Sequence, residues 1–182
     1  MNTEKRLEIE IKIRVQVLDT LRQKIMRLPA TLETGRVFER NIVFDTIRKK
    51  LRKQGILLRL RQQGLRAVFT VKMPVPGNSI YKVREETEVQ VSDFASMEKM
   101  IRAIGFRELF IYEKYREVFH VNGTLIMIDE TPIGNFIEIE GDPGRIDAIA
   151  SRLGFTRSDY ITDSYYQLFL ASGGSGHMVF SG

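Results

Sequence analysis

The stretch Leu7-Glu8-Ile9-Glu10-Ile11-Lys12-Ile13-Arg14-Val15 decides the fold class of this chain of 182 residues. Its odd-numbered positions are all apolar and its even-numbered positions are all charged, which is the period-two pattern of a strand with one apolar face. Further strand-like stretches follow at about 36–46, 56–63, 65–73, 80–91, 107–120, 124–130 and 136–140. We therefore expect a protein with eight strands.

Helical patterns alternate with these strands. An apolar stripe from Val17 to Leu28 predicts one helix, and similar stripes predict helices at about 93–104, 143–153 and 160–170. The pairs Gln63-Gly64 and Asn122-Gly123 predict tight hairpin turns. Each half of the chain thus reads as a strand, a helix and three more strands. The expected fold class is α+β, an antiparallel sheet or eight-stranded barrel with helices packed outside.

The composition excludes several classes of protein. The chain has no cysteine and only two histidines, which rules out disulfides, thiol catalysis, and cysteine or histidine-rich metal sites. There is no apolar run long enough for a membrane span, and the charged beginning of the chain does not resemble a signal peptide. The expected location is cytoplasmic. A net charge of +5 favours anionic partners.

The charged faces of the strands are more ordered than solubility requires. Acidic pairs such as Glu138 and Glu140 lie on some strands, and basic pairs such as Arg59 and Arg61 lie on others. Two geometries satisfy this pattern. Either an open sheet turns its charged face to water, or the sheet closes and the charges line a lumen. A lumen needs an occupant, and a triphosphate with divalent cations suits mixed basic and carboxylate groups.

An ordered series of motifs resembles the CYTH superfamily, the triphosphate tunnel metalloenzymes. Glu8-Ile9-Glu10-Ile11-Lys12 is similar to the family's ExExK signature, and Val43-Phe44-Asp45 resembles its aromatic-Asp motif. The remaining similarities are Leu58-Arg59-Leu60-Arg61, Phe69-Thr70-Val71-Lys72, Arg84-Glu85-Glu86-Thr87-Glu88, Glu113-Lys114-Tyr115-Arg116, and Asp129 followed by Gly134, Glu138 and Glu140. The resemblance implies an eight-stranded antiparallel tunnel that binds a triphosphate.

The resemblance also implies the site residues. The phosphate ligands would be Lys12, Arg59, Arg61, Lys72, Arg84, Lys114 and Arg116. The metal-binding carboxylates would be Glu8, Glu10, Asp129, Glu138 and Glu140, for Mg²⁺ or Mn²⁺.

Two residues are assigned catalytic roles. Lys12 is expected to contact phosphate rather than to act as a general base, because the surrounding carboxylates favour its charged form. Glu86 is expected to lie with Asp129 near a second cation that activates water. A first cation would be held by Glu8, Glu10, Glu138 and Glu140.

Other positions carry structural alternatives. Asp45 is expected to be structural, and ion-pair roles are weighed equally with ligand contact for Arg14, Arg84 and Glu88. Tyr165 matches a tyrosine of the family's C-terminal helix. Where the family often has a lysine two positions earlier, this chain has Asp163.

The resemblance leaves the reaction open. The preferred expectation is metal-dependent hydrolysis of a small triphosphate, such as tripolyphosphate, thiamine triphosphate or a nucleoside triphosphate. The alternatives are a class IV adenylyl cyclase, which forms cyclic AMP and pyrophosphate from ATP, and a non-catalytic module that binds polyphosphate or nucleotide. The basic run from Arg48 to Lys53 is interpreted as a solvated loop, so no nucleic-acid partner is expected. A homodimer is left open.

The domain boundaries follow from the same patterns. Residues 1–171 are expected to form a single tunnel domain. Residues 172–182 begin with a glycine- and serine-rich, linker-like segment and show no periodicity. They are expected to be a disordered or added tail outside the fold.

Overall fold

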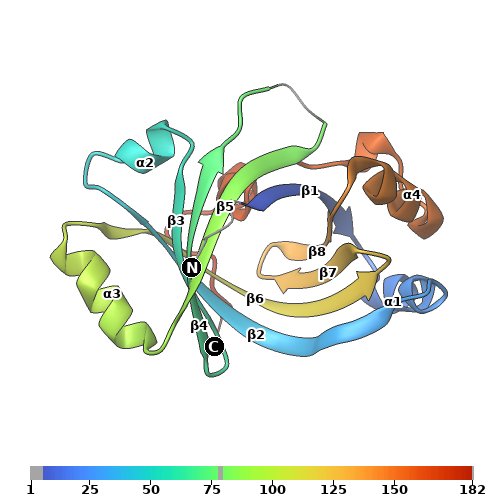
Figure 1. Ribbon diagram of the computed structural model, residues 1–182, viewed down its shortest axis with the longest axis horizontal. Helices are drawn as coiled ribbons and strands as arrows, with labels where there is room; N and C mark the ends of the chain where they lie inside the picture. Colours follow the sequence, from blue (N-terminus) through green and yellow to red (C-terminus); the bar gives the residue numbers. More distant parts are fainter. Residues whose placement is uncertain (1–5, 78–79, 182) are drawn as a thin grey trace.

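The computed structural model describes residues 6–77 and 80–181 and contains a closed barrel of eight antiparallel strands, which confirms the expected fold class (Figure 1). The strands are β1 (Arg6–Val15), β2 (Thr31–Asp45), β3 (Leu57–Gln63), β4 (Arg66–Pro74), β5 (Lys82–Val91), β6 (Arg107–Val121), β7 (Thr124–Thr131) and β8 (Gly134–Glu140). The helices are α1 (Leu18–Met26), α2 (Lys50–Lys53), α3 (Phe94–Ala103), α4 (Pro143–Leu153) and α5 (Tyr165–Ala171), with a 3₁₀ turn at Arg157–Asp159.

The barrel interleaves the two halves of the chain. Its strand order is β1-β5-β4-β3-β2-β6-β7-β8, so the first strand of each half pairs with the last strand of the other half. Glu10 of β1 lies opposite Lys82 of β5 on one side and opposite Glu140 of β8 on the other. This register brings charged motifs that are distant in the sequence onto one inner surface.

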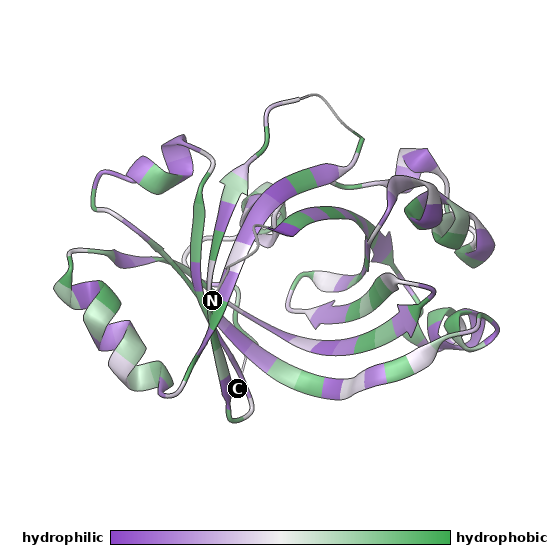
Figure 2. Cartoon of the chain, viewed as in Figure 1, coloured by the Kyte–Doolittle hydropathy of each residue, from purple (hydrophilic) through white to green (hydrophobic). Residues whose placement is uncertain are grey.

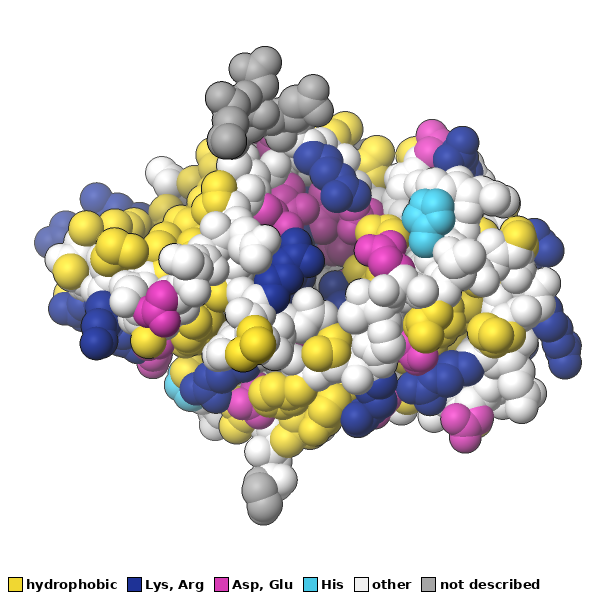
Figure 3. All heavy atoms as spheres, turned by 60° about the horizontal axis from the view of Figure 1, so that its bottom comes forward, with side chains coloured by type: hydrophobic (Ala, Val, Ile, Leu, Met, Phe, Trp, Pro, Cys, Tyr) yellow, Lys and Arg dark blue, Asp and Glu magenta, His cyan; other side chains and the backbone are white. Residues whose placement is uncertain are grey.

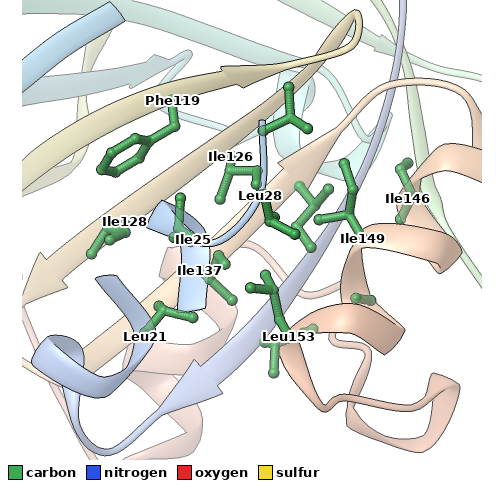
Figure 4. Close-up of a cluster of buried hydrophobic side chains, with 14 of the residues drawn as sticks. Leu21, Ile25, Leu28, Phe119, Ile126, Ile128, Ile137, Ile146, Ile149 and Leu153 are labelled. Atoms are coloured by element: carbon green, nitrogen blue, oxygen red, sulfur yellow. The ribbon is translucent and has the colours of Figure 1, made fainter. Parts of the chain in front are cut away.

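The apolar faces of the strands point outward and are covered by helices. Figure 2 shows the alternation of polar and apolar residues along the strands. Leu21 and Ile25 of α1 and Leu153 of α4 pack with Ile11 and Ile137 in the largest buried cluster (Figure 4). Full burial of each such aliphatic side chain contributes roughly 1.5–3 kcal/mol. The main hydrophobic core therefore lies outside the barrel wall, and charged side chains line much of the lumen.

A second apolar cluster covers the other half of the barrel. Ile101 of α3 packs against Ile42, Phe44 and Leu60, which lie on β2 and β3. The helix begins after Asp93, whose side chain accepts a hydrogen bond from the Ser96 backbone N–H, as an N-cap does.

The predicted turns have the backbone geometry that their sequences require. Asn122 and Gly123 both have left-handed φ angles, 48° and 76°, between paired residues Val121 and Thr124. Such angles are typical of a type I′ turn, which matches the twist of the hairpin strands. Gly154, with φ of 92°, caps the end of α4 in the left-handed conformation that glycine adopts most easily.

Two segments differ from the expectation for the end of the chain. The predicted helix at 160–170 begins only at Tyr165. Before it, Ile161 is extended and exchanges two backbone hydrogen bonds with Lys12, at 2.8 and 3.1 Å. Lys12 lies beyond the β1–β5 pairing, so its backbone groups are free to pair there.

The predicted tail is also corrected, because part of 172–182 packs against the barrel. β7 pairs with β6 only from Tyr115 onward, which leaves an earlier edge of β6 without a strand partner. Met178 fills that edge: it bonds Ile111 and Glu113 through its backbone, and its side chain is buried. Residue 182, like residues 1–5 at the other domain boundary, lies outside the described residues.

Smaller differences concern the second strand and the basic run. β2 begins at Thr31 rather than near residue 36, and the run from Arg48 to Lys53 contains the short helix α2 rather than only loop. No helix in the described part of the chain has the length and apolar character needed to cross a membrane.

Candidate active site

Charged side chains fill the lumen of the barrel. On β1, Glu8, Glu10 and Lys12 are each at most 5% exposed, because alternate residues of a closed barrel face inward. Within the described residues, the ion-pair network on this inner surface joins eight acidic and eight basic side chains. The acids are Glu8, Glu10, Glu39, Glu86, Glu88, Asp129, Glu138 and Glu140, and the bases are Arg6, Lys12, Arg59, Arg61, Lys72, Lys82, Lys114 and Arg116.

The deepest group is centred on Asp129, which is fully buried. Its two carboxylate oxygens accept hydrogen bonds from Lys114 at 2.9 Å, from Arg116 at 2.6 Å and from the Tyr165 hydroxyl at 2.6 Å. Burial, and then the negative charge of Asp129, raises the pKa of Tyr165. Tyr165 therefore remains a hydroxyl donor at neutral pH, and Asp129 is saturated by its three partners.

Lys12 lies beside this group. Its Nζ donates to Glu138 at 2.5 Å and lies 4.4 Å from the centre of the Tyr165 ring. Glu138 also accepts a hydrogen bond from Arg116. Although burial opposes it, the positive charges of Lys12 and Arg116 hold the pKa of Glu138 well below its usual range. Lys12 thus lies between a carboxylate and the face of an aromatic ring.

A second acidic group lies on β1, β5 and β8. Lys72 bridges Glu8 at 2.5 Å and Glu86 at 3.2 Å. Lys82 donates to Glu10 at 2.5 Å. Burial would raise the pKa of Glu10, but the neighbouring Lys82 ammonium lowers it to about 2.

Glu140 behaves differently from its neighbours. Its carboxylate accepts a hydrogen bond from Arg6 at 2.5 Å, and the Arg6 side chain is itself 64% exposed. Burial, followed by the negative charges of Glu8 and Glu10, raises the pKa of Glu140 to about 7. Three carboxylates therefore gather here with less compensating charge than Asp129 or Glu138 receives.

The basic pair of β3 faces a third group. Arg59 and Arg61 lie 3.3 and 3.7 Å from Glu88, and Arg61 lies 4.0 Å from Glu39. Thr70 donates to Glu88 at 2.7 Å. Glu39, almost fully buried, also lies 3.7 Å from Lys114 and so connects this group to the deep one.

The network runs from a closed interior to an open rim. Asp129 and Lys12 are almost inaccessible, whereas the side chains of Lys82, Arg61 and Glu88 are 19%, 18% and 35% exposed. Figure 3 shows acidic and basic side chains gathered in a hollow near the centre of one face. Beside Tyr165, Phe110 and Phe136 belong to a buried aromatic cluster.

Most of the expected site residues meet in this network, but some do not. Arg84 donates to the backbone oxygen of Gly55 at 3.0 Å. Arg14 donates to the backbone oxygen of Ile133, and Asp163 is exposed. Asp45 accepts backbone hydrogen bonds from residues 51 and 52 at the start of α2, which is the kind of contact that a structural role predicts.

The two carboxylates expected near a second cation contact different groups. Glu86 is paired with Lys72, whereas Asp129 is surrounded by Lys114, Arg116 and Tyr165. The two carboxylates have different partners, and Asp129 has no free oxygen. The second cation expected near Glu86 and Asp129 therefore stays a prediction.

Sequence reasoning missed four residues of the inner surface, Arg6, Glu39, Asn41 and Lys82. Arg6 and Lys82 continue the period-two rows of β1 and β5, so extending each motif by two residues would have found them. Glu39 and Asn41 lie on β2, where no motif directed attention to the inner face.

The donor set fits a triphosphate and divalent cations by its chemistry. Several buried polar atoms have no hydrogen-bond partner, including Glu8 Oε2, both side-chain polar atoms of Asn41, and the Nε atoms of Arg59 and Arg61. Carboxylate oxygens suit Mg²⁺ or Mn²⁺, and guanidinium groups suit phosphate. Across 6–77 and 80–181, no three acidic or histidine side chains converge as a ready-made metal site. The metal ligands therefore remain a prediction.

Comparisons with known proteins agree with this fold. A protein of Methanocaldococcus jannaschii named "putative adenylate cyclase" is 25% identical over 173 residues, which cover 89% of this chain and 98% of the relative. The structure of a putative adenylate cyclase from Vibrio parahaemolyticus has a TM-score of 0.82 at 20% identity and covers 92% of this chain and 99% of its own.

A third similar protein has a different activity in its description. This Hippeastrum protein is described as a putative adenylyl cyclase with a dominant triphosphatase activity. Its TM-score is 0.66 at 20% identity, covering 92% of this chain and 97% of its own. The CYTH domain model matches residues 6–153, which include every carboxylate and base of the network. The chain belongs to the CYTH domain family.

Proposed function

We propose that this protein is a divalent-metal-dependent hydrolase of small triphosphates, with inorganic tripolyphosphate as the simplest substrate. The substrate's phosphates would lie among the basic residues of the lumen. A substrate made only of phosphate matches a network made almost entirely of carboxylate, ammonium and guanidinium groups.

The charge balance of the network is the observation that carries this proposal. Eight acidic and eight basic side chains give a formal charge of zero. A triphosphate brings about four negative charges at neutral pH, and burying them without compensation is costly. Two divalent cations would restore neutrality. The network thus favours a triphosphate that enters with metal over either ion alone.

The basic residues have distinct tasks in this proposal. Lys114 and Arg116 are held by Asp129, which also accepts a hydrogen bond from the Tyr165 hydroxyl, so they would orient phosphate at the deep end without reorganising. Arg59 and Arg61 have unpaired Nε atoms and would bind phosphate oxygens from β3. Lys12 would contact the triphosphate as an ammonium ion.

The carboxylates Glu8, Glu10 and Glu140 would hold the metal, with Glu138 next along β8. Burial, and then the negative charges of Glu8 and Glu10, raises the pKa of Glu140, and a bound divalent cation would offset both effects. When bound, Mg²⁺ or Mn²⁺ supplies charge neutralisation for the phosphate oxygens and lowers the pKa of a bound water. Burial raises the pKa of Glu86, which makes that carboxylate a candidate proton acceptor for the attacking water.

A second candidate is cyclisation of ATP to cyclic AMP and pyrophosphate. The relative from M. jannaschii is named as a putative adenylate cyclase, and it covers 89% of this chain. This reaction would use the same phosphate ligands but would direct the ribose hydroxyl, rather than water, at the α-phosphorus.

One experiment separates these candidates. The purified protein is incubated with tripolyphosphate or with ATP, under Mg²⁺ or Mn²⁺, and orthophosphate, pyrophosphate, ADP and cyclic AMP are quantified. Orthophosphate from tripolyphosphate without cyclic AMP from ATP supports the hydrolase. Cyclic AMP with an equal amount of pyrophosphate replaces it with the cyclase.

A matched pair of variants tests the carboxylates. Glu10→Gln should abolish turnover with the fold retained, whereas Glu33→Gln, on an exposed glutamate of β2, should not. Unchanged metal dependence in Glu10→Gln would contradict the assignment of Glu10 as a metal ligand. Tight triphosphate binding without any product would favour a binding module.

A further inference from the structure

Lys82 is a partly buried cation that no motif of the family resemblance includes. It lies on β5, two residues before Arg84, and its Cα is paired with that of Glu10 on β1. Its Nζ donates to Glu10 Oε1 at 2.5 Å. The ammonium therefore occupies an oxygen of a carboxylate that the proposed function assigns to the metal.

The position of Lys82 differs from that of the deep bases. Lys114 and Arg116 share Asp129 with a tyrosine hydroxyl, whereas Lys82 has one ion-pair partner among the described residues and is 19% exposed. A lysine has a flexible four-carbon stem and can move its charge without moving the backbone. Lys82 can therefore leave Glu10 at less cost than the deep bases can leave Asp129.

A second ion pair, between Arg6 of β1 and Glu140 of β8, repeats this arrangement. Glu140 lies opposite Glu10 in the β1–β8 register, and its carboxylate accepts a hydrogen bond from the exposed Arg6. Glu10 and Glu140 are thus each neutralised by the long, flexible side chain of one base. A metal ion that approaches them must displace a positive charge first.

We propose that Lys82 is an internal counter-ion that holds Glu10 until a divalent cation takes its place, and that its ammonium then moves onto a phosphate of the substrate. This inference rests on the proposed function, because it requires metal and triphosphate in the same lumen. It follows that each ligand improves the binding of the other: the metal releases the ammonium, and the triphosphate gives the ammonium a new partner.

The test uses binding rather than turnover. Mn²⁺ affinity is measured by electron paramagnetic resonance without any anion. Affinity for the non-hydrolysable imido analogue of tripolyphosphate is measured by calorimetry at saturating Mn²⁺, the condition under which Lys82 is proposed to reach a phosphate. Lys82→Met removes the charge and keeps most of the stem. It should bind Mn²⁺ about tenfold more tightly and the analogue about tenfold more weakly, within the usual range for coupled sites.

The opposite signs of the two effects are the deciding result. If Lys82 contributed only to packing, Lys82→Met would lower the affinity for both ligands, and that outcome would overturn the inference. Lys82→Arg keeps the charge and should retain both affinities. If Lys82→Arg bound Mn²⁺ as tightly as Lys82→Met, charge would not be the cause. Lys99→Met, at an exposed position of α3, is the matched control and should change neither affinity.

Failure of the proposed function has a different signature. A wild-type protein that bound neither Mn²⁺ nor the analogue would overturn both proposals. A wild-type protein that bound both, with no change in Lys82→Met, would overturn only the role of Lys82.

Discussion

The substitution Glu140→Gln should stabilise the metal-free protein at high pH. The folded-state pKa of Glu140 is raised from 4.5 to about 7, mainly by burial and then by Glu8 and Glu10. Between these values the folded carboxyl keeps a proton that the unfolded one has lost, so stability falls as pH rises from 4.5 to 7. At about 1.4 kcal/mol for each pH unit, the full cost above pH 7 is roughly 3 kcal/mol.

Glutamine is neutral at every pH, so it avoids this cost. We expect the free energy of unfolding of Glu140→Gln to exceed that of wild type by up to about 3 kcal/mol at pH 8 and by less than about 1 kcal/mol at pH 5. The larger value is an upper limit, because solvent reaches the exposed Arg6 beside this carboxylate.

Urea denaturation at the two pH values, in the presence of a chelator, measures the effect. Glu33→Gln is the control for the loss of one negative charge at an exposed position. An equal increase in the free energy of unfolding at both pH values, or no increase at pH 8, would refute the link between the raised pKa of Glu140 and stability. Added Mn²⁺ should stabilise wild type at pH 8 and should stabilise Glu140→Gln far less.

Three further substitutions test other parts of the structure. Tyr165→Phe removes the hydroxyl that donates to Asp129 and should lower the free energy of unfolding by about 1–3 kcal/mol in chemical denaturation; an unchanged value would mean that this buried bond contributes nothing. Asp45→Ala removes the acceptor at the start of α2 and should cost about 1–2 kcal/mol; a large loss of kcat at constant KM would instead point to a direct catalytic role. Met178→Ala should destabilise the protein by about 2–5 kcal/mol, and an unchanged melting temperature would show that the segment after α5 is not packed in solution.

The barrel and most of its inner surface could be predicted because both depend on neighbouring residues in the chain. Strand parity is a local property: once Ile9 and Ile11 face the outer core, Glu8 and Glu10 must face inward. The resemblance then placed Lys12, Arg59 and Asp129 in one lumen, and the register brings them there.

The parts that could not be predicted depend on contacts between distant segments. Arg84 has the parity of an inward residue, yet the loop at Gly55 supplies a backbone acceptor that turns it away from the network. Met178 follows a glycine-rich stretch and has no local pattern. It is ordered against β6 because β7 pairs with only part of that strand, which is a property of the assembled barrel.

Because β1 pairs with β8, the barrel cannot close until β8 has been synthesised. Glu10 must wait for Glu140, a partner 130 residues later in the chain (140 minus 10). At roughly 5–20 residues per second, the ribosome needs on the order of ten seconds to supply it. Until then the first strand has no partner on that side, and contacts over such separations form slowly. A nascent chain that stops before β8 would therefore carry the amino-terminal glutamates without the lumen that gives them their function.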